Sequence, residues 1–89
     1  MEEVSIKKLD LKQLKEKNIN SWPIWEKEIS QFDWYYESTE ECFILEGEIV
    51  VYTETKQYEI KSGDFVTFAK GLQCKWEVKK PVRKHYQFI

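Results

Sequence analysis

The sequence predicts a small all-β protein that closes on itself as a short barrel around an aromatic interior. At 89 residues the chain can hold one hydrophobic core, so residues 1–89 are expected to form a single domain. Hydrophobic residues make up 42% of the chain and aromatic residues 16%, with only three glycines and two prolines, which is sufficient for a packed core. Apolar and polar residues alternate with a period of two over most of the chain after Pro23, which is typical of strands.

The first part of the chain, up to about residue 20, is the least regular. The stretch 10–17 carries Leu11 and Leu14 among lysines, a pattern that predicts one or two helical turns with Asp10 as the cap. Pro23 then disfavours helix in the residue before it. We therefore expect a short N-terminal helical or irregular segment that lies over the barrel.

Strands are expected to dominate from Trp22-Pro23 to the end of the chain. Phe32, Trp34 and Tyr36 share one parity, which places them on the buried face of the first strand. Turn residues follow every 8–12 positions or so, which indicates a sandwich or barrel and not a helix-crossover fold. The further strands are expected at 41–45, 48–53, 57–60, 65–68, 73–78 and 83–89, with turns at 46–47, 55–56, 62–64 and 70–71 and a break at 80–81.

Two of these strands are apolar on both faces, at 42–45 and 49–52. An exposed strand of this kind invites association. The outer face with Phe43 and Leu45 is therefore expected to be covered by the N-terminal segment or by a second copy of the chain, and a homodimer is a reasonable expectation.

Charge and hydropathy argue against two classes of partner. The formal net charge is -2 and the lysines are scattered, so no extended positive field is available for nucleic acid. No apolar run approaches the ~20 residues that cross a bilayer, and the acidic start does not resemble a secretion signal. We expect a cytoplasmic protein in which Cys42 and Cys74 are free thiols. The abundance of lysine and glutamate also predicts a thermostable protein.

The spacing of glutamate and glycine resembles the two motifs of the cupin superfamily, whose members are small jelly-roll barrels. In the first motif two histidines precede a glutamate that is followed, after six residues, by a glycine, and Glu40 and Gly47 match its second half. In the second motif two glycines flank a proline, and Gly63 and Gly71 match both, with alanine in place of the proline. The resemblance covers about residues 32–89 and implies a small cupin-type jelly-roll barrel.

The metal-binding histidines of that family are replaced in this chain. Their positions hold Trp34, Tyr36 and Cys74, and Glu40 alone keeps its identity, while His85 lies outside both motifs. Three histidines and a carboxylate suit Fe, Mn, Ni or Zn. We therefore expect no metal and no cofactor, with a divalent metal on cysteine and glutamate left as an alternative.

The cupin register would turn five residues into the barrel as candidate ligand-binding residues: Trp34, Tyr36, Glu40, Cys74 and Trp76. Their rings could stack on a planar or sugar-like ligand, or could simply fill the core. Glu40 is the candidate catalytic residue, because a carboxylate in an apolar barrel would have a raised pKa and could act as acid or base. It could equally be a structural carboxylate at the barrel mouth.

Two other polar positions suggest less chemistry. Cys74 as a nucleophile would need a neighbouring histidine, lysine or helix N-terminus, and a strand cysteine between aromatics is more typical of a buried apolar residue. Lys84 and His85 are adjacent on one strand, so their side chains point to opposite faces and do not form a proton-transfer pair. His85 is predicted to be a packing or surface residue.

Three functions remain open, because one fold hosts many activities. The first is a metal-independent binder of a small polar or carbohydrate-like metabolite in the barrel. The second is a hydrolase or isomerase with Glu40 as acid or base, which the resemblance of Trp76-Glu77 and 82–86 to the ureidoglycine aminohydrolase branch of cupins implies. The third is a structural or interaction module with a filled barrel. Whether the protein is an enzyme is left open.

Overall fold

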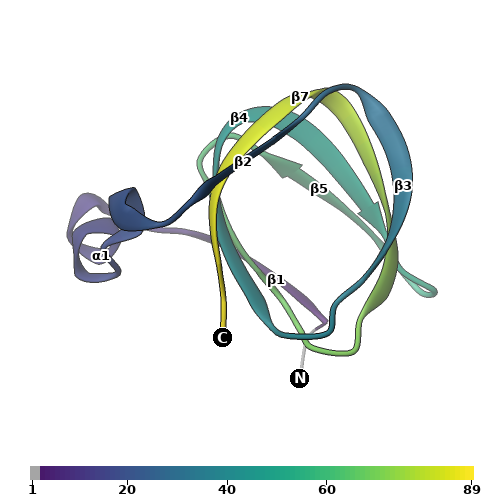
Figure 1. The fold of residues 1–89 in the computed structure, drawn as a ribbon, viewed down its shortest axis with the longest axis horizontal. Helices are drawn as coiled ribbons and strands as arrows, with labels where there is room; N and C mark the ends of the chain where they lie inside the picture. Colours follow the sequence, from purple (N-terminus) through teal and green to yellow (C-terminus); the bar gives the residue numbers. More distant parts are fainter. Residues whose placement is uncertain (1–2) are drawn as a thin grey trace.

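A computed structural model describes residues 3–89, which fold into one antiparallel sheet that curls into a barrel beside a short helical segment (Figure 1). The predicted small all-β barrel with an N-terminal helix is confirmed. The strands are β1 (Val4–Lys8), β2 (Ile24–Lys27), β3 (Ser30–Tyr35), β4 (Glu40–Tyr52), β5 (Gln57–Lys61), β6 (Asp64–Phe68) and β7 (Gln73–Phe88), and the helices are α1 (Leu11–Glu16) and a 3-10 turn, η1 (Ile19–Ser21).

Two long strands, β4 and β7, pair with each other and run the length of the barrel. The first part of β4 also pairs with β6 and its last part with β5, while β7 pairs first with β3 and then with β2. The turn predicted at 46–47 and the break predicted at 80–81 are wrong, because both strands continue through these positions and bend. The β4–β7 register shifts between Ile44 and Ile49, and such bulges bend a strand and increase its twist.

The N-terminal segment contains one strand that was not predicted. β1 pairs with β6 at the edge of the sheet. Only Val4 of its five residues is buried, so the alternation of buried and exposed residues that marks a strand is weak in its sequence. Helix α1 follows the prediction: the Asp10 carboxylate accepts a hydrogen bond from Gln13 N, and the Gln13 side chain accepts one from Asp10 N. No helix within residues 3–89 is long and apolar enough to span a lipid bilayer.

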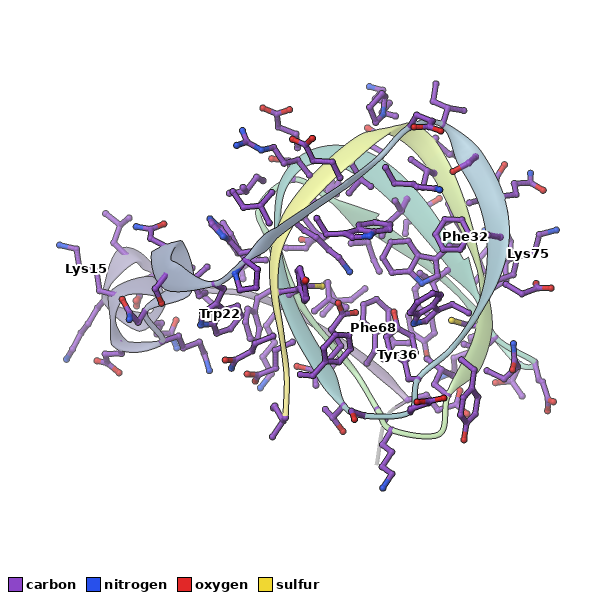
Figure 2. The ribbon with its side chains drawn as sticks, viewed as in Figure 1. Lys15, Trp22, Phe32, Tyr36, Phe68 and Lys75 are labelled. Atoms are coloured by element: carbon purple, nitrogen blue, oxygen red, sulfur yellow. The ribbon has the colours of Figure 1, made fainter. Side chains whose placement is uncertain are left out.

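At Phe43 the outer face of β4 is covered by the N-terminal segment, which was one of the two expected covers, whereas Leu45 is half-buried and lies outside this cluster. Ile19 and Trp22 pack with Phe65 and Phe43 against the outside of the barrel. Figure 2 shows Trp22 where the helical segment joins the strands. The part of this face at Phe43 therefore has a cover within the chain, and the homodimer stays a prediction.

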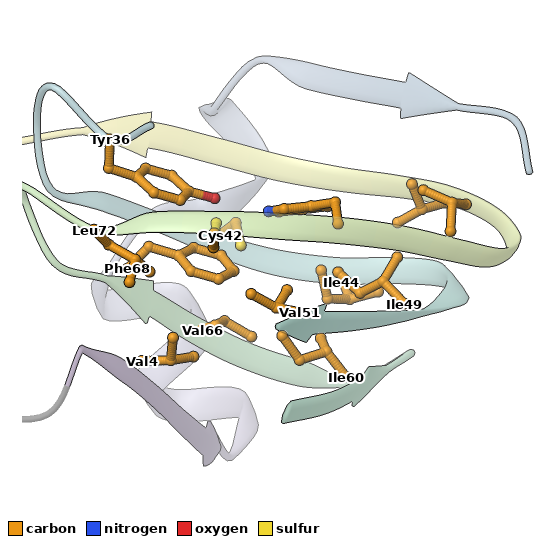
Figure 3. Packing of buried hydrophobic residues seen from close by; sticks show 14 residues of the cluster. Val4, Tyr36, Cys42, Ile44, Ile49, Val51, Ile60, Val66, Phe68 and Leu72 are labelled. Atoms are coloured by element: carbon orange, nitrogen blue, oxygen red, sulfur yellow. The ribbon is translucent and has the colours of Figure 1, made fainter. Parts of the chain in front are cut away.

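The barrel interior is aliphatic in one part and aromatic in another (Figure 3). Ile49, Val51 and Ile60 are buried together where β4 pairs with β5. In the other part the rings of Tyr36 and Phe68 stack with centroids 4.9 Å apart. The aromatic part is where the fold leaves a cavity.

Candidate functional site

A cavity of about 230 Å³ lies among aromatic side chains from β2, β3, the residue that follows β3, and β7. Its walls are mainly apolar, and Glu40 and Lys84 are its two charged lining residues. Figure 2 shows Phe32 and Tyr36 inside the ring of strands. The full lining is Trp25, Phe32, Trp34, Tyr36, Glu40, Trp76, Lys84, Tyr86 and Phe88.

Trp76 is the centre of the aromatic wall and is 2% exposed. It is directly opposite Phe32 in the β3–β7 pairing, and the two rings stack with centroids 5.8 Å apart. Trp25 meets Trp76 edge-on at 5.8 Å. Offset-stacked and edge-on contacts are the favourable arrangements of aromatic rings, so these contacts hold the rings of the wall in fixed orientations.

A buried ion pair faces this wall. Lys84 Nζ donates a hydrogen bond to Glu40 Oε2 at 2.9 Å, and both side chains are only 5% exposed. The same ammonium lies 4.7 Å from the ring centroid of Trp76 and 4.9 Å from that of Trp25. Each charge thereby offsets part of the cost of removing the other from water, and the rings add a cation–π contribution.

Five lining residues were not among the predicted site residues, and Lys84 is the charged one; the others are Trp25, Phe32, Tyr86 and Phe88. The predicted break at 80–81 interrupted the alternation, whereas the structure continues β7 and keeps Lys84 on the same face as Trp76 and Val82. The even-numbered parity of this strand was the signal that could have located it. His85 points to the opposite face, where its Nδ1 lies 3.0 Å from the carbonyl oxygen of Trp22.

The structure brings four of the five predicted ligand-binding residues to this cavity: Trp34, Tyr36, Glu40 and Trp76. Trp34 is 47% exposed, so it lies at the mouth and is not the buried residue that its parity predicted. Cys74 does not line the cavity but is buried in the core, with its Sγ donating to the Trp34 carbonyl oxygen at 3.6 Å. A ligand-binding role for these residues stays a prediction.

Residues 14–86 match the family described as the EutQ-like cupin domain. The chain belongs to this family. The family confirms the predicted cupin-type barrel, and the match begins before the 32–89 region that carries the motifs.

The EutQ-like cupin is similar to several solved structures. A DUF861-family protein from Thermotoga maritima is 56% identical, with 98% of this chain and 100% of that chain covered and a TM-score of 0.96. A putative ethanolamine utilization protein Q from Salmonella typhimurium is 24% identical (96% and 68% covered, TM-score 0.68), and the Clostridium difficile EutQ protein is 21% identical (96% and 66% covered, TM-score 0.69). At these lower identities the likeness shows the fold alone. None of the curated proteins is significantly similar to the chain.

The residues of this EutQ-like cupin do not fit the metal centre that the cupin motifs imply. Within residues 3–89 no three histidine, cysteine, aspartate or glutamate side chains come together as a metal-binding group. Glu40, which keeps its identity in the motif, is hydrogen-bonded to an ammonium group instead. The two charged groups of the cavity are therefore paired with each other.

Burial keeps the thiols and the phenol of the core protonated. It raises the pKa of Cys42 to about 12 and that of Cys74 to about 11. Burial, together with the charge of Glu40, also raises the pKa of Tyr36 far above its ordinary value. Neither cysteine is a thiolate near neutral pH, and the Tyr36 hydroxyl is available as a hydrogen-bond donor.

We expect Cys42 and Cys74 to be inert toward a disulfide reagent such as DTNB in the native protein at about pH 8, and to react once guanidinium unfolds it. Because their folded pKa values exceed the unfolded value of about 8.5, the stability they contribute is complete below that pH and is lost as pH rises toward 11–12. Urea midpoints measured across this range test the second statement. Rapid labelling of the native protein would contradict the expected inertness of the thiols. A urea midpoint that does not change at alkaline pH would contradict the expected loss of stability.

Proposed function

We propose that this EutQ-like cupin is a metal-independent binding protein that holds a small polar metabolite in its aromatic cavity. The observation that supports the proposal is an apolar cavity with one buried ion pair, Glu40–Lys84, in its wall. Aromatic rings supply contact area to a ligand, while a few fixed polar groups orient it. Aromatic walls with a few buried polar groups are typical of small-molecule sites.

The size of the cavity supports a single-ring ligand. Its volume of about 230 Å³ exceeds the ~150 Å³ that accommodates benzene in a protein interior, and is below the ~300 Å³ at which sites for drug-sized molecules begin. A cavity of this size that the protein's own side chains leave open argues against the structural module with a filled barrel. Hydrolysis or isomerisation would need Glu40 to exchange a proton with substrate, and its carboxylate is held by Lys84.

A thermal-shift screen with native mass spectrometry tests the proposal on the purified protein. We expect an organic ligand to raise the melting temperature, because a ligand at 100 times its Kd stabilises the native state by about 2.7 kcal/mol. A chelator is expected to leave the melting temperature unchanged. One metal ion per chain with a chelator-sensitive melting temperature would contradict the metal-independent proposal, and no response to any compound would favour the structural module.

Two adjacent exposed residues provide a matched pair of variants. Trp34 lines the cavity at 47% exposure, whereas Tyr35, at 53%, does not. Trp34→Ala is expected to weaken ligand binding by about 3- to 10-fold, the value of one aromatic contact, and Tyr35→Ala is expected to leave it unchanged. Equal effects of the two substitutions would place the binding site elsewhere.

A further inference from the structure

We propose that the ligand is a small, flat, uncharged molecule with a carbonyl group, such as an aromatic amide. The cavity selects against both carboxylates and amines. This inference rests on the proposed function. The inference follows from how Glu40, Lys84 and Trp76 are paired. Each of these residues lines the cavity and each is buried.

The charge of the cavity is already balanced. Glu40 and Lys84 carry opposite charges and hydrogen-bond to each other, both 5% exposed. A ligand with a net charge would bring a third charge against the mainly apolar walls with no partner left for it, and an uncompensated buried charge is strongly unfavourable. An uncharged ligand avoids this cost.

A cationic ligand is disfavoured for a second reason. Aromatic rings around a carboxylate are the usual receptor for an ammonium group. Here the position of the cation is taken by the protein itself, because Lys84 Nζ lies 4.7 Å and 4.9 Å from the centroids of Trp76 and Trp25 and 2.9 Å from Glu40. An amine would have to displace Lys84.

Hydrogen-bond donors lack acceptors in this cavity. Lys84 has three N–H groups and donates one of them to Glu40. A buried donor without an acceptor costs about 1–3 kcal/mol, so a carbonyl oxygen is the group that the cavity lacks.

The rest of the ligand follows from the walls. A flat ring matches the aromatic faces, whereas the many hydroxyl groups of a sugar would meet mostly apolar atoms. Of the two predicted ligand classes, the walls therefore favour a small polar metabolite over a carbohydrate-like one. An amide N–H could in addition donate to the Glu40 carboxylate.

The test compares three probes that share one ring: benzamide, benzoate and benzylammonium, titrated calorimetrically into the wild-type protein near neutral pH. We expect benzamide to bind at least about tenfold more tightly than either ion. Removing one charge should change the order. Lys84→Met leaves a carboxylate among rings and should favour benzylammonium, whereas Glu40→Gln leaves an ammonium and should favour benzoate. The double variant Glu40→Gln/Lys84→Met, uncharged again, should return the preference to benzamide.

Benzoate or benzylammonium binding best to the wild type would overturn this inference and leave the proposed function standing. The inference would also be overturned, with the proposed function still standing, if none of the three probes bound while another type of compound stabilised the protein. An order that is the same in wild type and both single variants would also overturn it, because charge would then not select the ligand. If a single variant does not fold, the wild-type order decides. No binding by any compound would overturn the proposed function as well.

Discussion

Replacing Lys84 with methionine is expected to lower the free energy of unfolding by about 3–5 kcal/mol, the typical cost of removing one partner from a buried ion pair. Methionine keeps most of the length and apolar surface of the side chain beside Trp25 and Trp76, so the loss reports mainly on the removed charge. The Glu40 carboxylate is then left 5% exposed among apolar groups without its ammonium. Urea unfolding followed by tryptophan fluorescence or circular dichroism measures the change.

Two further variants make this prediction specific. Glu40→Met/Lys84→Met removes both charges and is expected to be as stable as the wild type or about 1–4 kcal/mol more stable, so that the two substitutions are strongly non-additive. Lys80→Met removes a lysine of the same strand whose ion pair with Glu48 is exposed, and should cost less than about 1 kcal/mol. Equal losses from Lys84→Met and Lys80→Met would mean that the Glu40–Lys84 pair is not buried in solution.

Gly47→Ala is expected to destabilise the protein by about 2–5 kcal/mol through strain and a backbone clash. Gly47 has a φ of +103°, and a Cβ added there would lie 2.7 Å from the Cα of Val82 and even closer to the carbonyl oxygen of Pro81. These are backbone atoms of β7, which cannot move aside as a flexible side chain can. The bend of β4 therefore depends on the absence of a side chain.

Gly71→Ala is the matched control for this prediction. Gly71 has a φ of +90°, but an added Cβ would meet no atom within 4 Å. It should therefore show only the cost of the positive φ, about 1–2 kcal/mol. Denaturant midpoints of the two variants give the clash by difference, and a Gly47→Ala variant no less stable than Gly71→Ala would rule out the close approach of β4 and β7.

Local pattern was a good guide to the faces of individual strands. The shared parity of Phe32 and Tyr36, and the alternation around Trp76, placed these rings in the interior, where the structure has them. The glycine spacing that begins at Glu40 indicated the cupin-type barrel, and Asp10 marked the start of α1. Each of these features depends on residues close together in the chain, which is why the sequence reveals them.

Continuity of the strands was not predictable in the same way. Glycine at 47 and proline at 81 are typical of turns, yet in this protein both lie inside bent strands. A positive φ can reverse the chain or form a bulge, and the choice depends on which strand lies alongside. For Gly47 that neighbour is Pro81, which is 34 positions away and therefore invisible to a local pattern.

The sequence by itself determined which side chains share a face, since alternation is a property of the extended backbone. It also determined that the chain has a single histidine, His85, which is a matter of residue identity. Only the tertiary structure decided that Lys84 meets Glu40, 44 residues apart, that Cys74 lies in the core beside the cavity, and that Trp34 is at its mouth. Those contacts join different strands, and their geometry is set by sheet register and strand bending, which non-local packing determines.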